Sequence, residues 1–306
     1  MKSKLKILAS LLLLLSIFSL CSFKAFAEDD LISVGVEDPD ERWEVSVSKV
    51  SNKNIWAYHQ VTLNFNSKSA GADARLINGT VYVAARQFFE NNTGMKVTYY
   101  SGRKTLNING GGLNMDIIDG SNVVYANSRT LFSMSPSTIM TNGRMYVPLT
   151  IVAKALGLNY TYTANGRIAN LSGSIKPIIS GSTFYRSDEV YWLSRIISAE
   201  SRGEPLLGQI AVGSVVMNRV KSSQYPNTIW GVIFDRKYGV QFSPILDGSI
   251  YSTPTESAVI AAKITLEGYR VNSTALFFLH PRLSSSSWIP KNRDYLFSIG
   301  KHDFYA

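Results

Sequence analysis

Short runs in which apolar and polar residues alternate fill residues 70–171, a pattern typical of half-buried β-strands. Two stretches repeat: NGTVYV begins at Asn78 and NGRMYV at Asn142, and each is followed by a helical stretch (residues 84–91 and 149–156), a glycine and a β-rich run. The repeat predicts a small, duplicated, β-rich α+β module. Asn-Gly pairs favour tight turns between its strands, at Asn78-Gly79, Asn109-Gly110, Asn142-Gly143 and Asn165-Gly166.

From residue 187 onward the apolar positions follow helical spacing instead. Val190, Leu193 and Ile197 predict a helix that Ser187 or Asp188 can cap and that ends before Gly203 and Pro205. A second helix is expected over residues 206–221, and a third ends at residue 266. The third begins with the capping-box sequence Thr253-Pro254-Thr255-Glu256, with the proline in the first helical position. The pattern therefore predicts a mainly α-helical domain with long loops over residues 187–306.

The remaining segments connect or precede these two regions. Gly, Ser and Pro residues make 172–186 a predicted linker, and the extension over residues 28–69 could add an edge strand to the module. The chain opens with Lys2, Lys4 and Lys6, an apolar run over residues 7–20 and an Ala-x-Ala pattern ending at Ala27. This pattern predicts a secretory signal peptide, residues 1–27, and hence export. An uncleaved anchor is the alternative, although spanning a bilayer needs about 20 apolar residues.

Glu200 occupies the next apolar position of the first helix, three residues after Ile197. A carboxyl group there should be half buried, and burial raises its pKa because it disfavours the charged form. Such a group can act as a general acid near neutral pH. The alternative is a structural glutamate that is neutralised by Arg195 or Arg202.

Charge and composition exclude several functions. The net charge is +9, and removal of the four leader lysines leaves +5, which suits either attraction to anionic wall polymers or a merely soluble basic surface. The sequence has no cluster of basic residues of the kind that would indicate nucleic-acid binding. The single cysteine, Cys21, lies in the leader, and His59, His280 and His302 are dispersed. The sequence therefore predicts neither a metal site nor a cofactor. A structural hydrogen bond is favoured for both His280 and His302, with a catalytic base at His302 as the alternative.

Six sequence blocks follow one another in the C-terminal region. They are AESRGEP (199–205), GQIAVGSVVMNRV (208–220), YPNTIWGVIF (225–234), QFSPILDGSIY (241–251), ALFFLHP (275–281) and IGKHDFY (299–305). These blocks resemble, in the same order, the catalytic domain of the SleB-type cell-wall hydrolases, the spore cortex-lytic family. The resemblance implies a lysozyme-like or transglycosylase-like fold over residues 187–306. It also implies that the first glutamate of A-E-x-R-G-E, here Glu200, is the catalytic acid.

The duplicated module, residues 70–171, resembles the copper amine oxidase-like N-terminal domain of exported bacterial proteins. Copper is not expected there, because His59 is the sole histidine before His280 and copper favours imidazole and sulfur ligands. We interpret the module as non-catalytic. Wall attachment, contact with an accessory protein and a simple spacer role remain open.

The loop that carries Gln241, Phe242, Ser243 and Asp247 is a candidate for lining a substrate groove. Amide and hydroxyl groups can bind sugar hydroxyls, and Phe242 can stack on a pyranose ring. Core packing is the favoured interpretation for the ring of Tyr251.

Most glycosidases use two carboxylates. Beside Glu200 the sequence offers Glu204, which is expected to accept hydrogen bonds from the amides of its own turn, and Asp247, which could activate water. The family resemblance implies that a single glutamate suffices, as in a lytic transglycosylase that leaves a 1,6-anhydro sugar.

The leading hypothesis is therefore an exported enzyme, in the cell wall or spore, that cleaves peptidoglycan glycan strands between N-acetylmuramic acid and N-acetylglucosamine. Spore cortex and vegetative wall are both open as substrates. One alternative is an N-acetylmuramoyl-L-alanine amidase, although three dispersed histidines offer a poor zinc site. The other is a non-catalytic wall-binding protein.

Overall fold

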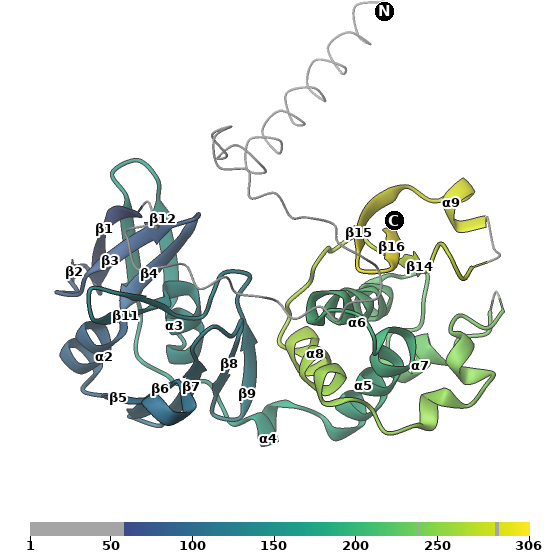
Figure 1. The fold of residues 1–306 in the computed structure, drawn as a ribbon, viewed down its shortest axis with the longest axis horizontal. Coiled ribbons are helices and arrows are strands. Elements are labelled where there is room, and N and C mark those ends of the chain that lie inside the picture. The colour runs from purple at the N-terminus through teal and green to yellow at the C-terminus, as the bar shows by residue number, and fades with distance from the viewer. Residues whose placement is uncertain (1–57, 238, 285–287) are drawn as a thin grey trace, which may run out of the picture. The chain divides into compact units, whose positions relative to one another are not determined.

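The computed structural model describes residues 58–237, 239–284 and 288–306 of the 306-residue chain. The expected signal peptide and the first part of the extension, residues 28–57, lie outside the described residues. The described part mixes helices and strands, as the predicted α+β class requires (Figure 1). None of its helices is long and apolar enough to cross a membrane.

An eight-stranded sheet forms the upper layer of the N-terminal region in Figure 1, with the strand order β10-β11-β4-β3-β1-β13-β12 and with β2 paired to β1. The strand expected at an edge is β1, and it lies inside the sheet because it pairs with β3 on one side and, in parallel, with β13 on the other. The strands are β1 (Tyr58–Phe65), β2 (Lys68–Ser69), β3 (Ala74–Ile77), β4 (Thr80–Ala84), β10 (Ile139–Thr141), β11 (Arg144–Pro148), β12 (Asn159–Thr163) and β13 (Ile168–Ser172).

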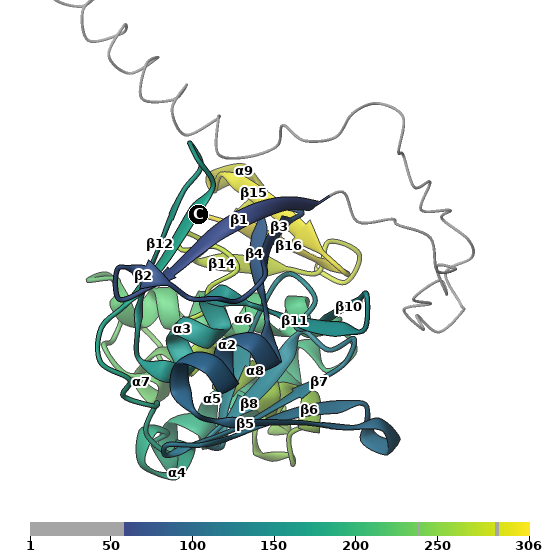
Figure 2. The same ribbon diagram turned by 90° about the vertical axis from the view of Figure 1, so that its left-hand side faces the viewer.

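A second, antiparallel sheet follows the chain order from β5 to β9. Helices α2 (Ala85–Thr93) and α3 (Leu149–Leu156) lie between the two sheets in both views (Figures 1 and 2) and bury Phe88, Phe89 and Val152 in a shared core. The second sheet consists of β5 (Lys96–Tyr100), β6 (Thr105–Gly110), β7 (Leu113–Ile118), β8 (Val123–Ala126) and β9 (Arg129–Phe132), with the short helix η1 (Ser101–Arg103) between β5 and β6.

The predicted Asn-Gly turns at residues 78–79 and 142–143 are confirmed. Asn78 and Gly79 have φ values of 46° and 77°, and Asn142 and Gly143 have values of 50° and 69°. Positive φ at both central residues matches the twist of the strands that such a turn joins. These turns connect β3 to β4 and β10 to β11.

Three helices, α5 (Ser187–Ser201), α6 (Leu206–Lys221) and α8 (Glu256–Leu266), pack against one another in the C-terminal region (Figure 1). Their bounds match the predicted helices to within a few residues. Gly213 lets α6 approach both neighbours, because a Cβ atom there would lie 2.9 Å from Ile197 and 2.7 Å from Thr265. The shorter helices are α4 (Gly181–Phe184), α7 (Ile229–Ile233), η2 (Ser243–Ile245), η3 (Ser249–Tyr251) and α9 (Trp288–Asn292).

The helix caps differ from those expected. Arg186 holds the N-cap position of α5 without a side-chain hydrogen bond, and the Asp188 carboxylate instead binds the Arg186 guanidinium at 2.9 Å. In α8 the cap is Thr255, whose hydroxyl accepts from the amide of Ala258 at 3.2 Å. Pro254 therefore precedes the helix, because a cap must lie just outside the first hydrogen-bonded turn.

A small antiparallel sheet of order β14-β16-β15 completes the C-terminal region. Phe304 lies in the middle strand and stacks on Phe297, with ring centroids 4.7 Å apart, so the sheet adds to the helical core. The strands are β14 (Phe277–Leu279), β15 (Tyr295–Ile299) and β16 (His302–Tyr305).

Candidate active site

Glu200 lies one residue before the end of α5 and is half buried. Its carboxyl group forms neither a hydrogen bond nor an ion pair with any described residue. The two arginines that could have neutralised it bind elsewhere: the Arg195 guanidinium lies 3.6 Å from the centre of the Tyr191 ring, and Arg202 donates to the Ser198 carbonyl. The structure thus lacks the ion pair of the structural alternative.

Burial, and then the nearby Asp247 carboxylate, raise the pKa of Glu200 to about 7, against an opposing effect of the Arg219 charge. At this pKa about half of the molecules carry a protonated Glu200 at neutral pH. The group can therefore both donate and accept a proton under the same conditions, as acid–base catalysis requires.

Arg219 falls near the end of the second predicted helix, where a cap for the last carbonyls of that helix is favoured over a substrate contact. The structure instead makes its charge a neighbour of Glu200. Arg219 belongs to α6, is only 5% exposed, and donates from Nε to the Leu276 carbonyl at 2.8 Å. Three aromatic rings surround its guanidinium at 5.1 to 5.5 Å, those of Tyr225, Phe242 and Phe277. Burying a cation costs free energy unless such partners stabilise it. The spacing of residues in the sequence does not reveal these partners, because they come from other segments of the chain.

The predicted substrate loop contributes only some of its candidates to the surface. Ser243 and Asp247 are exposed, and Gln241 is half buried with its amide donating to the Gly239 carbonyl at 3.1 Å. The Asp247 carboxylate accepts from the Ser249 amide at 2.8 Å, and its hydrogen bonds with Ser249 lower the pKa of Asp247. It is therefore an exposed anion near Glu200.

Phe242 corrects the expectation of sugar stacking. Its side chain is 2% exposed and packs in the helical core against Arg219 and Phe278. A buried ring offers no open face to a pyranose. The ring belongs instead to the buried hydrophobic core of the helical region.

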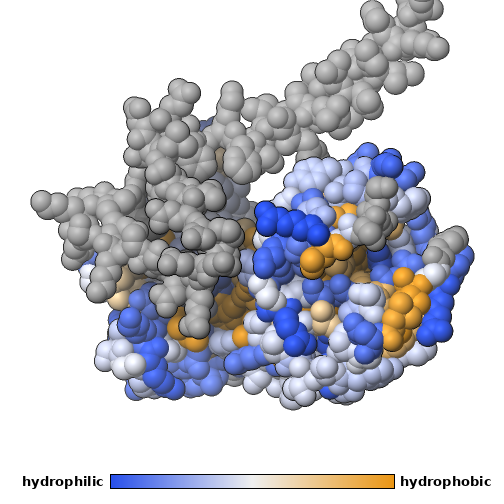
Figure 3. Space-filling model, turned by 45° about the vertical axis from the view of Figure 1, so that its right-hand side comes forward, coloured by the Kyte–Doolittle hydropathy of each residue, from blue (hydrophilic) through white to orange (hydrophobic). Residues whose placement is uncertain are grey.

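Tyr251 is the opposite case: the expected core packing is wrong, because its side chain is 61% exposed. Its ring lies 6.3 Å from Trp192, which contacts Phe234 at 5.2 Å, and Phe234 in turn contacts Trp230 at 5.1 Å. Trp230 is 56% exposed. Figure 3 shows separate orange patches of hydrophobic residues among hydrophilic ones, and it does not distinguish these rings, because Tyr and Trp have intermediate hydropathy. Exposed rings of this kind can stack on sugars.

Glu204 holds the turn between β15 and β16 rather than its own turn. Its carboxylate is 6% exposed, accepts from the Lys301 amide at 2.9 Å, and lies 3.9 Å from Nδ1 of His302. Gly300 has no Cβ atom to collide with this carboxylate. Glu204 therefore joins the end of the Glu200 helix to the small sheet.

The two C-terminal histidines are embedded beside this contact. His302 is buried and packs edge-to-face on the ring of Phe278. Burial is the main cause that lowers the pKa of its imidazole. Nδ1 of both His280 and His302 is buried without a hydrogen-bond partner in the described residues, so the expected structural bond is absent at that atom. Across the described ranges, no group of three or more His, Cys, Asp or Glu side chains could hold a metal.

Comparisons with protein families agree with the motifs. Residues 203–305 match the family described as Cell Wall Hydrolase, and residues 61–171 match the Copper amine oxidase N-terminal domain. The chain thus carries a cell wall hydrolase domain after a copper amine oxidase-type N-terminal domain. The first match begins three residues after Glu200.

The chain is, more particularly, homologous to the SleB spore cortex-lytic enzymes. It is 34% identical to a spore cortex-lytic enzyme of Bacillus cereus over 53% of this chain and 62% of that protein, and 34% identical to one of Bacillus subtilis over 39% and 38%. Among solved structures, the catalytic domain of the germination-specific lytic transglycosylase SleB from Bacillus anthracis is 38% identical, with 40% of this chain and 97% of that chain covered and a TM-score of 0.37.

Proposed function

We propose that the protein is an exported lytic transglycosylase that cleaves peptidoglycan between N-acetylmuramic acid and N-acetylglucosamine, with Glu200 as its single acid and base. The observation that carries the proposal is the half-buried Glu200 carboxyl, which has no partner among the described residues and a pKa raised to about 7. The named relatives act on spore cortex, which favours cortex over vegetative wall as the substrate.

In the proposed reaction Glu200 first donates its proton to the glycosidic oxygen, and the bond from C1 of the muramic acid to that oxygen breaks. The carboxylate then takes the proton from the 6-hydroxyl of the same sugar, while this oxygen forms a bond to C1. The products are a free 4-hydroxyl on the departing sugar and a 1,6-anhydro end. Glu200 returns to its protonated form, and water is not consumed.

The charges around Glu200 support both halves of this cycle. The exposed Asp247 carboxylate favours the protonated acid before bond cleavage, and the buried Arg219 guanidinium favours the carboxylate that forms afterwards. Asp247 also leaves open a hydrolytic variant, in which it activates water and the product has a new reducing end.

Substrate contacts are proposed for Gln241 and Ser243, whose amide and hydroxyl can bind sugar N-acetyl and hydroxyl groups. The exposed rings of Trp230 and Tyr251 replace Phe242 as the proposed stacking surfaces. No metal or other cofactor enters the proposed mechanism.

We further propose that residues 187–306 form a lysozyme-like catalytic domain, that 172–186 link it to the module, and that residues 70–171 are a non-catalytic duplication. Two strand-helix-strand units support the duplication: β4, α2 and β5, and β11, α3 and β12. Both helices are followed by a left-handed glycine, Gly94 with φ 67° and Gly157 with φ 65°. Wall or accessory-protein contact is the role proposed for this module.

Mass spectrometry of sacculi digested by the protein tests the function. We expect 1,6-anhydro-muramic ends. New reducing ends would instead indicate hydrolysis with Asp247 as the base, and chelator-sensitive release of free L-alanine termini would indicate an amidase. Unchanged sacculi would favour a wall-binding protein.

A further inference from the structure

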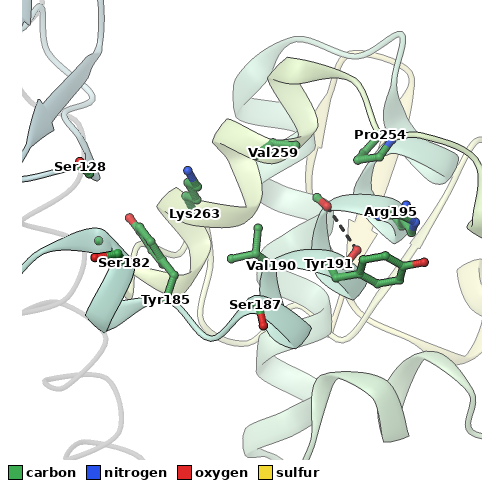
Figure 4. A pocket seen from close by; sticks show the side chains of 12 residues that line it. Ser128, Ser182, Tyr185, Ser187, Val190, Tyr191, Arg195, Pro254, Val259 and Lys263 are labelled. Carbon is green, nitrogen blue, oxygen red and sulfur yellow. Dashed lines mark hydrogen bonds between the residues drawn. The ribbon is translucent and has the colours of Figure 1, made fainter.

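A shallow groove of about 560 Å³ runs beside α5 (Figure 4). Figure 4 shows Lys263 and Tyr185 at one end and Tyr191 and Arg195 at the other, with Val190 between them. Aliphatic and hydroxyl-bearing residues complete the lining, among them Val259, Pro254, Ser182 and Ser187.

This groove is distinct from the proposed catalytic site. Ser187, Val190, Tyr191 and Ser194 follow the spacing of one helix face and line the groove. With 3.6 residues per turn, Glu200 lies on roughly the opposite side of α5. The proposed catalytic carboxyl does not line the groove. A ligand bound there would not be the sugar bond being cleaved.

Two cations give the groove its charge. Arg195 and Lys263 form no ion pair with any acid in the described part of the chain, and their contacts are with rings: Arg195 with Tyr191 at 3.6 Å and Lys263 with Tyr185 at 5.5 Å. Nε of Arg195 is buried without a hydrogen-bond partner. No acidic residue lines the groove. Neither cation is therefore paired with an acidic side chain of the described residues.

Other charged and hydroxyl groups beside the groove do have acidic partners, unlike Arg195 and Lys263. Arg186, one residue before α5, is paired with Asp188 at 2.9 Å, and the Tyr185 hydroxyl is held by Glu267 at 2.7 Å. Tyr185 is thus a fixed wall of the groove, whereas Arg195 and Lys263 have donors left for a ligand. Such donors bind carboxylates through charge-assisted hydrogen bonds.

We propose that this groove binds a carboxylate-bearing stem peptide of peptidoglycan, outside the catalytic cleft. The inference rests on the proposed function for its substrate class. Carboxylates of the stem meet Arg195 and Lys263, alanine methyl groups meet Val190 and Val259, and the serine hydroxyls bind the peptide backbone. Binding at a second place holds the enzyme on a polymer while Glu200 acts on another part of it, which raises the local concentration of cleavable bonds.

The test uses the Glu200→Gln protein, so that turnover does not alter the polymer. Two double variants are compared in this background. The groove pair is Arg195→Gln with Lys263→Gln. The control pair is Lys96→Gln with Lys221→Gln, which replaces two exposed lysines and removes the same charge. On sacculi freed of teichoic acid, the groove pair is expected to weaken binding about tenfold or more, as loss of two charge-assisted contacts implies. The control pair should change affinity less than twofold.

Two further measurements keep the result specific. Arg195→Lys retains the charge and should keep most of the affinity, and thermal melts verify that each variant is folded. A soluble stem tripeptide should compete for binding, whereas a stem-free N-acetylglucosamine oligomer should not. Equal loss in both charge pairs, no competition by the tripeptide, or stronger competition by poly-glycerol phosphate would overturn the proposal.

The binding result is independent of the proposed chemistry. If wild-type protein leaves no anhydro ends but the groove pair still loses stem binding, the transglycosylase assignment fails and the groove stands. If anhydro ends form but the groove pair binds as well as the control, the groove proposal alone fails.

Discussion

Two glutamates at the ends of packed helices have opposite surroundings. Glu267 follows the last residue of α8, and its carboxylate binds Arg129 through two contacts of 2.7 Å, the Tyr185 hydroxyl at 2.7 Å and Lys154 at 3.1 Å. Glu200 at the end of α5 has no such partner in the described residues.

The difference in partners decides the protonation of the two groups. Burial acts to raise the pKa of both, but Arg129, Tyr185 and Lys154 outweigh it and hold the pKa of Glu267 below its ordinary value. At Glu200 burial prevails, and the pKa rises to about 7. Burial alone thus does not identify a catalytic carboxyl group, whereas burial without partners does point to one.

The largest expected effect is on turnover. Glu200→Gln keeps the shape of the side chain but removes the transferable proton, so release of muropeptides should fall about 10²- to 10⁴-fold. Glu267→Gln, measured on protein that a thermal melt shows to be folded at the assay temperature, should lose less than tenfold in turnover. Comparable losses of turnover in the two variants would show that Glu200 has no special role in the reaction.

The next effect is on stability. Glu267→Ala leaves Arg129 buried without its anion, and breaking a buried pair in this way costs about 3–5 kcal/mol. Glu90→Ala breaks the exposed pair with Arg86 and should cost about 1 kcal/mol or less. Urea unfolding of both variants measures the contrast, and equal costs would mean that the Glu267 contacts contribute little.

A smaller effect is the pH dependence of stability. Because the folded pKa of Glu200 is raised, the folded protein binds more protons than the unfolded chain between about pH 4.5 and 7, and this contribution is lost as pH rises. Glu200→Gln should therefore be more stable than wild type at pH 8, by on the order of 1–3 kcal/mol, and similar to it at pH 4.5. A constant difference across this range in thermal melts would argue against a raised pKa.

The smallest predicted effect concerns Asp247. Its carboxylate contributes to the raised pKa of Glu200, so Asp247→Asn should move the alkaline fall of activity to lower pH by roughly one unit or less. Asp116→Asn, the same change within the N-terminal module, should leave the pH profile in place. Complete loss of turnover in Asp247→Asn would instead indicate that Asp247 is a catalytic base.

Local signals in the sequence predicted much of this fold. The bounds of α3, α5 and α6 followed from apolar spacing with Gly or Pro beyond their ends, and the half-buried position of Glu200 followed from the same spacing. The Asn-Gly turns at residues 78–79 and 142–143 followed from their backbone preference. The turn expected at Asn109-Gly110 was wrong, because both residues lie in β6 and the chain turns at Gly111 and Gly112 instead. Each of these features depends on residues a few positions apart.

Features that depend on distant residues could not be predicted. β1 lies inside its sheet because it pairs with β13, about a hundred residues later, and Glu204 binds the Lys301 amide 97 residues away. Phe242 is buried in the helical core, with its ring centre 5.2 Å from the Arg219 guanidinium of α6. Periodicity shows that a residue is apolar or charged, but it does not show which distant partner will meet it.

The ionisation of Glu200 can be measured directly by NMR titration of protein labelled with ¹³C at the glutamate side-chain carboxyl, with the signal assigned by its absence in Glu200→Gln. We predict a titration midpoint near pH 7 for this one carboxyl group. A midpoint near the ordinary glutamate value of about 4.3 would contradict it, because Glu200 would then be an anion at neutral pH with no proton to give.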